Sequence, residues 1–121
     1  MARVMIADDS ESVRLALRDM VEAGKHKVIA EAVDGNDTLE KFDSVKPDVL
    51  LLDVAMPKKD GMETLIEIIK YNPKAKVIMI TAHDDMELIE NCTKVGAVAY
   101  ITKPFNTDEI LQTISYAFEE K

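Results

Sequence analysis

Short apolar runs alternate with segments of helical periodicity from one end of the chain to the other. The runs have the length of single strands and cover 3–7, 27–32, 48–52, 76–80 and 97–101. Three of them are nearly continuous in Val, Ile, Leu or Met, which is typical of strands covered on both faces. The 27–32 run is mixed, and the 97–101 run is small and alternating. The pattern predicts a parallel sheet of βαβ units, with these two strands at or near its edges.

The segments between and after the runs repeat their apolar residues at the spacing of amphipathic helices. We expect helices over 11–23, 37–45, 62–70 and 84–95, and a fifth helix that begins near Asn106. The apolar positions of the first three are Val13, Leu17, Met20 and Val21; Leu39, Phe42 and Val45; and Met62, Leu65, Ile66 and Ile69. In the last helix, the residues expected to pack inward are Ile110, Leu111, Ile114, Ala117 and Phe118.

Several helix ends carry recognisable signals. Gly24 and Gly96 are expected to end the first and fourth helices, because glycine is favoured just past a helix. Asp84 and Glu87 have the spacing of a capping box at the start of the fourth helix. Five strands and five helices in one short chain predict an α/β fold with an open, doubly wound sheet. Right-handed crossovers then place helices on both faces of that sheet.

Composition narrows the class of protein. The chain has 121 residues, too few for two ordinary domains, so we expect one domain over 1–121. Cys92 is the sole cysteine and cannot form an internal disulfide, which fits a reducing compartment. No apolar run approaches the roughly 20 residues that cross a bilayer, so we predict a cytoplasmic protein without a membrane segment. The net charge of −8 argues against nucleic-acid binding, which requires a cationic surface.

Polar residues follow four of the five predicted strands. Asp8 and Asp9 follow the first strand, Asp53 the third, Thr81 the fourth and Lys103 the fifth. In an open parallel sheet the carboxyl ends of the strands share one edge, where ligands bind. Three carboxylates, a hydroxyl and an ammonium would then converge there. This set predicts an aspartate that accepts a phosphoryl group beside a divalent cation.

Each of these residues also has a simpler interpretation. The aspartate pair could cap a helix N-terminus, and Asp53 could begin a turn. Lys103 could be an ordinary surface lysine, and Thr81 an ordinary β-branched strand terminus. What favours the functional interpretation is that all of them occur together.

The combination of motifs resembles the receiver domain of two-component response regulators, most closely a stand-alone chemotaxis regulator of the CheY type. The motifs are Asp8-Asp9, Asp53-Val54-Ala55-Met56-Pro57 with Asp60-Gly61, Thr81-Ala82 and Lys103-Pro104. The resemblance covers essentially the whole chain. It implies the flavodoxin-like, CheY-like fold with strand order 2-1-3-4-5, which brings the first, third and fourth strands together in the middle.

The resemblance also implies a metal site and a phosphoacceptor. Asp53 would accept the phosphoryl group from a histidine kinase. Asp9 and Asp53 would bind Mg²⁺ directly, Asp8 would act through water, and Ala55 would supply its backbone carbonyl. Mn²⁺ is expected to substitute for Mg²⁺, since both ions take oxygen ligands.

The remaining motif residues would respond to the phosphoryl group. By the same resemblance, Lys103 would pair with Asp53 and then with the phosphoryl oxygens, with a cis bond to Pro104. Thr81 and the amide of Ala82 would contact the phosphoryl group, and inward movement of Thr81 would let Tyr100 change position. The chain would thus be a signalling protein rather than an enzyme, catalysing only its own phosphorylation and dephosphorylation.

The expected output face is formed by the fourth helix, fifth strand and fifth helix. Because Asp84, Asp85, Glu87 and Glu90 outnumber Lys94 on the fourth helix, we expect a motility switch or adaptor protein with a basic surface. An ordinary solvated helix face is the alternative. An archaeal motility adaptor fits this acidic face. The chain is expected to be a monomer, and a phosphatase is a further expected partner.

Other functions remain open. A phosphorelay intermediate or a single-domain regulator outside motility would use the same site. An aspartate-dependent phosphatase of the haloacid-dehalogenase type would need an acidic residue where Ala55 stands. A flavin or nucleotide binder would need a Gly-, Ser- or Thr-rich phosphate loop in place of 8–12. His83 could accept a phosphoryl group, but an exposed histidine at a helix start is the simpler interpretation.

Overall fold

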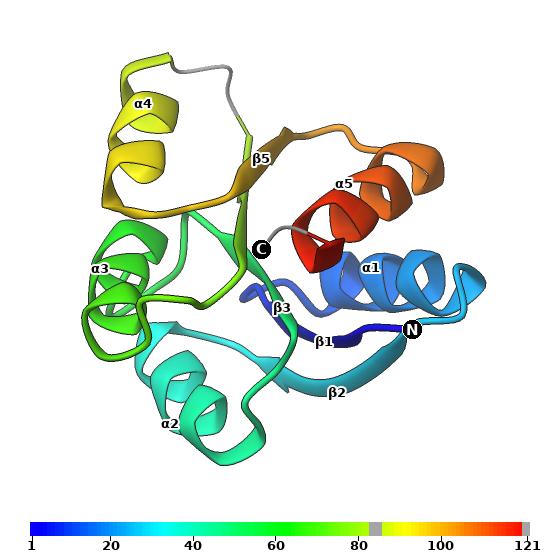
Figure 1. The fold of residues 1–121 in the computed structure, drawn as a ribbon, viewed down its shortest axis with the longest axis horizontal. Coiled ribbons are helices and arrows are strands. Elements are labelled where there is room, and N and C mark those ends of the chain that lie inside the picture. The colour runs from blue at the N-terminus through cyan, green and yellow to red at the C-terminus, as the bar shows by residue number, and fades with distance from the viewer. Residues whose placement is uncertain (83–85, 120–121) are drawn as a thin grey trace.

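The computed structural model describes residues 1–82 and 86–119, in which strands and helices alternate strictly (Figure 1). The strands are β1 (Arg3–Ala7), β2 (Lys27–Ala32), β3 (Val49–Asp53), β4 (Val77–Thr81) and β5 (Ala99–Thr102). The helices are α1 (Glu11–Ala23), α2 (Gly35–Val45), α3 (Gly61–Tyr71), α4 (Met86–Val95) and α5 (Thr107–Glu119).

The strands form one parallel sheet in the order β2-β1-β3-β4-β5. This confirms the predicted fold class and strand order, including the positions of β2 and β5 at the two edges. The register aligns the ends of the central strands: Ala7 pairs with Leu52, Asp53 with Ile80 and Thr81 with Thr102. Residues that follow these strands therefore meet at one edge of the sheet.

Helices cover both faces of the sheet, with α1 and α5 on one side and α2, α3 and α4 on the other (Figure 1). Successive strand residues point to opposite faces, so neighbours enter different cores. Leu51 packs with Leu17 and Ile110 under α1 and α5, whereas Leu50 packs with the residues of the second core, under α2, α3 and α4. Burial on both faces explains why the central strands are continuous apolar runs.

Most predicted boundaries lie within two residues of the observed ones. β1, β2 and α1 match the predicted ranges, whereas β3, β4 and β5 begin one or two residues later than the apolar runs. β5 begins late because the N–H groups of Gly96 and Ala97 donate to the carbonyl of Cys92 at the end of α4. Gly24 and Gly96 directly follow α1 and α4, and Asn106 accepts from the N–H of Glu109 at the start of α5. Asp84, and with it the predicted capping box, lies outside the described residues.

Two predicted inward-facing residues are exposed. In α3 the side facing the sheet runs through Leu65 and Ile68, and Ile66 is 47% exposed. Consecutive helical residues are about 100° apart around the axis, so burying Leu65 turns Ile66 away. In α5 the buried stripe ends at Ala117, and Phe118 is 42% exposed for the same reason. The prediction was wrong for Ile66 and Phe118.

Candidate functional site

Three aspartates meet at the carboxyl edge of the sheet. Asp8 and Asp9 follow β1, Asp53 ends the adjacent strand β3, and each contributes a carboxylate oxygen to a group within 4.8 Å. Asp8 and Asp53 are buried, whereas Asp9 is exposed. Asp8 and Asp9 are far from Asp53 in the sequence. The pairing of β1 with β3 brings the three side chains together.

Asp8 is held in place from several sides. Its N–H donates to the Ala32 carbonyl at 3.0 Å, and its Oδ1 accepts the Ser10 N–H at 2.8 Å. Its second oxygen, Oδ2, is buried without a hydrogen bond. The nearest cation is the Lys103 ammonium, whose Nζ lies 3.6 Å from that oxygen. A buried carboxylate oxygen with no donor is costly unless a cation completes its environment.

Lys103 lies between the two buried aspartates. Its Nζ is 3.6 Å from Asp8 Oδ2 and 3.8 Å from Asp53 Oδ1. Its backbone N–H donates to the carbonyl of Thr81 at 2.8 Å, and its peptide bond to Pro104 is cis. The lysine side chain is 28% exposed, so it is not the ordinary solvated lysine of the simpler interpretation.

The environment of Asp53 disfavours its charged form. Burial raises its pKa from an ordinary 3.8 to about 6, and the negative charge of Asp8 acts in the same direction. Lys103 and the N–H of Ala55, 3.4 Å from Asp53 Oδ1, oppose this shift without overcoming it. The three carboxylates thus carry more negative charge than the ammonium of Lys103 neutralises.

The aspartate cluster fits a hard divalent cation. Mg²⁺ takes oxygen ligands, keeps several waters and needs only one or two carboxylates, and this site offers three with an open, exposed side at Asp9. The hydrogen-bond-free Oδ2 of Asp8 fits the same conclusion. Asp8, Asp9 and Asp53 would hold the ion, which would supply positive charge beside the nucleophile. Ala55 lies next to the cluster and is exposed.

Of the other predicted site residues, Thr81 and Ala82 lie at the same edge, whereas Tyr100 lies within β5. Thr81 ends β4 and is buried, and Ala82 follows it in an exposed position. Tyr100 lies in β5 opposite Met79 and is 44% exposed. His83 lies outside the described residues.

Capping of α1 does not involve the aspartate pair. The N-cap of α1 is Ser10, whose Oγ accepts the N–H of Val13, so the interpretation of Asp8 and Asp9 as caps is wrong. Asp60 caps α3 in the same manner by accepting from Glu63. The capping residues are thus distinct from the carboxylates of the cluster.

Arg14, which contacts the backbone of Asp8 from α1, was not identified from the sequence. Arg14 Nη1 donates to the backbone carbonyl of Asp8 at 2.8 Å, and its Nε bonds Glu31 at 3.1 Å. Arg18 pairs with the other oxygen of Glu31. Burial opposes ionisation of Glu31, but the two arginines together outweigh it and hold the Glu31 pKa below its usual value. The position of Arg14, one helical turn after Ser10, was the signal in the sequence that it could reach back to Asp8.

The chain matches the response regulator receiver domain family over residues 4–115. It is 37% identical over 117 residues to the chemotaxis protein CheY of Listeria monocytogenes, an alignment that covers 97% of this chain and 98% of that one. It is also 33% identical over 115 residues to the transcriptional regulatory protein PdtaR of Mycobacterium tuberculosis. That alignment covers 95% of this chain and 56% of PdtaR.

Solved structures show the same fold. The CheX-CheY-BeF3-Mg+2 complex from Borrelia burgdorferi contains a chain that superposes with a TM-score of 0.94 at 31% identity, covering 98% of this chain and 90% of that one. Among the helices of the described residues, none is long and apolar enough to cross a membrane. The chain is thus similar both to chemotaxis proteins and to a regulator of transcription.

Proposed function

Because the chain belongs to the response regulator receiver domain family, we propose that Asp53 is its phosphoacceptor. The observation that carries the proposal is the position of the Asp53 carboxylate, buried beside Asp8, Asp9 and the Lys103 ammonium. With a pKa of about 6, Asp53 is mostly ionised at neutral pH and can act as a nucleophile.

In the proposed reaction, an Asp53 oxygen attacks the phosphorus of a phosphohistidine on a histidine kinase. The new oxygen–phosphorus bond forms as the phosphorus–nitrogen bond breaks, and the imidazole keeps the electron pair. Attack of one anion on another requires nearby positive charge. Lys103 supplies part of it at 3.8 Å from the nucleophile, and Mg²⁺ or Mn²⁺ bound by the aspartates would supply the rest.

The phosphoryl group would then change the surface of the protein. Thr81 ends β4, the neighbour of β3, and Ala82 follows it, so the Thr81 hydroxyl and the Ala82 amide would donate hydrogen bonds to the new phosphoryl oxygens. Movement of Thr81 would favour a different position for Tyr100 on the adjacent strand β5. We propose that this switches the face formed by α4, β5 and α5, which binds the output partner.

We propose a role in chemotaxis, in the cytoplasm and as a monomer, with a motility switch or adaptor protein as the partner. The similarity to the Listeria CheY over nearly the full length of both chains supports it. The PdtaR similarity favours a second candidate, a single-domain regulator outside motility. A phosphatase is a further expected partner, and the chain itself would have no separate substrate.

Incubation with Mg²⁺ and acetyl phosphate, followed by intact mass spectrometry, tests the assignment of Asp53. We expect the mass of one phosphoryl group on the wild type and none on Asp53→Asn. Asp60→Asn is the control, because it removes a carboxylate from the same loop while asparagine still caps α3. Phosphorylation of Asp53→Asn would contradict the assignment, and no phosphorylation of the wild type would contradict the proposed function.

A further inference from the structure

The edge of the sheet opposite the aspartate cluster has the opposite charge. The connections from helix to strand all lie at this amino-terminal edge because every strand is parallel. They carry Lys25, Lys46, Lys74 and Lys76, and the one acidic residue among them, Asp48, accepts the backbone N–H of Arg3 at 2.8 Å. In a chain with a net charge of −8, these connections together carry a net positive charge.

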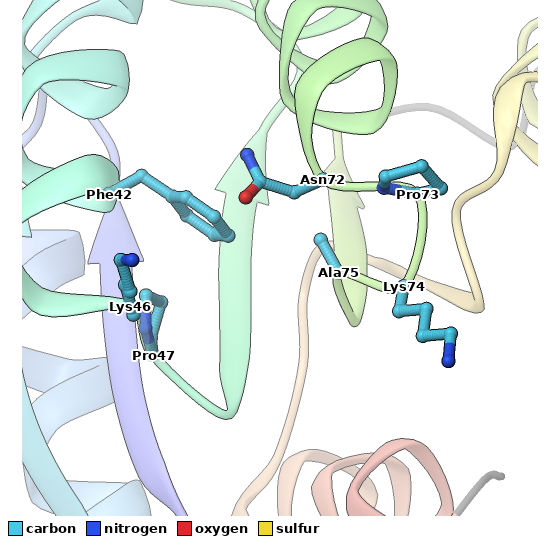
Figure 2. A pocket seen from close by; sticks show the side chains of 7 residues that line it. All are labelled: Phe42, Lys46, Pro47, Asn72, Pro73, Lys74 and Ala75. Atoms are coloured by element: carbon cyan, nitrogen blue, oxygen red, sulfur yellow. The ribbon is translucent and has the colours of Figure 1, made fainter.

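A pocket of about 420 Å³ opens at this edge between the α2–β3 and α3–β4 connections. We call it the lysine-rimmed pocket. Figure 2 shows Phe42 and Pro47 on one side of it, and Asn72 and Ala75 on the other. The lining is completed by Lys46, Pro73 and Lys74. Its volume is in the range of sites that bind ligands, and its lining combines an apolar floor with cationic groups.

The two connections that form the pocket are fixed by backbone hydrogen bonds. Lys46 donates its N–H to the Phe42 carbonyl at 2.9 Å and accepts from Arg3 Nη1 at 2.8 Å. On the other side, Asn72 donates to Ile68 at 2.7 Å and accepts from the N–H of Ala75 at 2.9 Å. A pocket with such walls is preformed, so a ligand does not have to order them on binding.

Among the described residues, the lysines of the pocket have no carboxylate partners. In the parts of the chain that the structure describes, neither Lys46 nor Lys74 forms an ion pair. By contrast, Lys41 on α2 pairs with Asp37, and Lys59 in the loop before α3 pairs with Glu67. The pocket lining itself contains no acidic residue. Positive charge left without a partner around an apolar opening is complementary to a ligand that is acidic and partly apolar.

We propose that the lysine-rimmed pocket binds an acidic peptide segment of a partner protein. One apolar side chain of the segment enters between Phe42 and Ala75, and flanking carboxylates contact Lys46 and Lys74. A peptide fits better than a free anion because the lining combines four apolar residues with two lysines. This site lies at the opposite end of the strands from Asp53, so it gives the protein a second binding surface.

A peptide titration followed by NMR of the ¹⁵N-labelled protein tests the proposal. The probe is a blocked peptide with a central leucine flanked on both sides by glutamates. We expect amide shifts concentrated at Lys46 and at Asn72–Ala75, and equal binding by Asp53→Asn. A peptide with serine in place of the leucine should bind about tenfold more weakly, since it loses one buried apolar side chain.

The matched variants are Lys46→Glu/Lys74→Glu and Lys25→Glu/Lys27→Glu. Both change the net charge equally, and each pair contains one lysine with positive φ, Lys46 at 46° and Lys25 at 65°. We expect the first pair to weaken binding about tenfold or more and the second to change it much less.

Three outcomes would overturn the proposal: no amide shifts with the leucine peptide, equal weakening by both variant pairs, or shifts of the same amides by hexanoate as strong as those by the peptide. Equal weakening would indicate attraction by overall charge, and the hexanoate result would indicate a small carboxylate ligand. Phosphorylation of Asp53 is measured separately, so failure here leaves the proposed function unaffected.

Discussion

The Asp53 carboxylate lies buried beside two other carboxylates, and this makes its ionisation unfavourable for folding. The folded protein holds the Asp53 proton more tightly than the unfolded chain does, because its pKa is about 6 instead of 3.8. Its contribution to stability is therefore complete below about pH 3.8 and is lost as the pH rises through about 6. Without a metal ion, Asp53 destabilises the fold at neutral pH.

We predict that Asp53→Asn stabilises the metal-free protein at neutral pH by on the order of 3 kcal/mol, because the Asp53 pKa rises from 3.8 to about 6 and one pKa unit corresponds to about 1.4 kcal/mol. Near pH 4 the gain should nearly vanish. Urea unfolding of the wild type and the variant at several pH values measures the difference, and Asp19→Asn, in an exposed position of α1, is the control. A pH-independent difference would contradict the raised pKa.

Arg14 would act on the proposed metal site only by positioning Asp8, because it bonds the Asp8 backbone carbonyl rather than a carboxylate oxygen. Arg18 shares Glu31 with it, but no bond from Arg18 reaches Asp8. The pair therefore separates two effects: support of the Asp8 backbone and neutralisation of Glu31.

We expect Arg14→Gln to weaken Mg²⁺ binding about tenfold, as the loss of an outer partner typically does, and Arg18→Gln to change it little. Isothermal titration calorimetry measures the affinities, and urea unfolding shows whether the fold survives. Equal loss in both variants would show that the charge on Glu31 matters and the Asp8 contact does not.

At the scale of elements, α3 begins in direct contact with the end of β3. A Cβ at Gly61 would lie 2.3 Å from the Asp53 carbonyl oxygen and 2.6 Å from Val54 Cα. The helix start and the strand end are thus too close for any side chain.

We predict that Gly61→Ala destabilises the protein by about 2 kcal/mol and disturbs the Asp53 loop, because backbone must move to admit the methyl group. Gly24→Ala is the control. Its Cβ would meet only Leu111 Cδ2 within 3 Å, at the end of a flexible side chain, and its φ of −87° suits alanine. Thermal unfolding should place this variant near the wild type, and a larger loss for Gly24→Ala would contradict the argument.

At the scale of the whole molecule, charge is divided between the two edges of the sheet. The aspartate cluster occupies the carboxyl edge, and the connections at the amino-terminal edge carry Lys25, Lys46, Lys74 and Lys76. The proposed cation and the proposed acidic peptide would therefore bind at opposite edges of the sheet. On α4, Glu87 and Glu90 are exposed, so their carboxylates are accessible to a basic partner.

For the proposed basic partner, Glu87→Lys/Glu90→Lys should weaken binding of the phosphorylated protein by about tenfold or more while Asp53 phosphorylation continues. Asp19→Lys/Glu22→Lys on α1 has the same spacing and exposure and should bind nearly normally. Binding is measured by surface plasmon resonance against a candidate motility adaptor. Unchanged binding by the α4 variant would favour an ordinary solvated face.

The fold was largely predictable because its signals are local. The continuous apolar runs of β3 and β4 indicated strands buried on both sides, and the glycines after α1 and α4 marked where those helices end. The strand order was implied by the family resemblance and not by periodicity. Ile66 and Phe118 were misplaced because helical rotation is set by contacts that a single helix does not reveal.

The sequence by itself determined which residues can do chemistry, since Asp8, Asp9, Asp53, Thr81 and Lys103 each follow an apolar run. Only the tertiary structure decided how they act on one another. The β1–β3 register brings the carboxylates within 4.8 Å, and burial then raises the Asp53 pKa. The contact of Arg14 with Glu31 and the lysine-rimmed pocket emerged only from the structure, because each joins segments that are distant in the chain. Proximity and burial arise from packing, and a linear pattern contains neither.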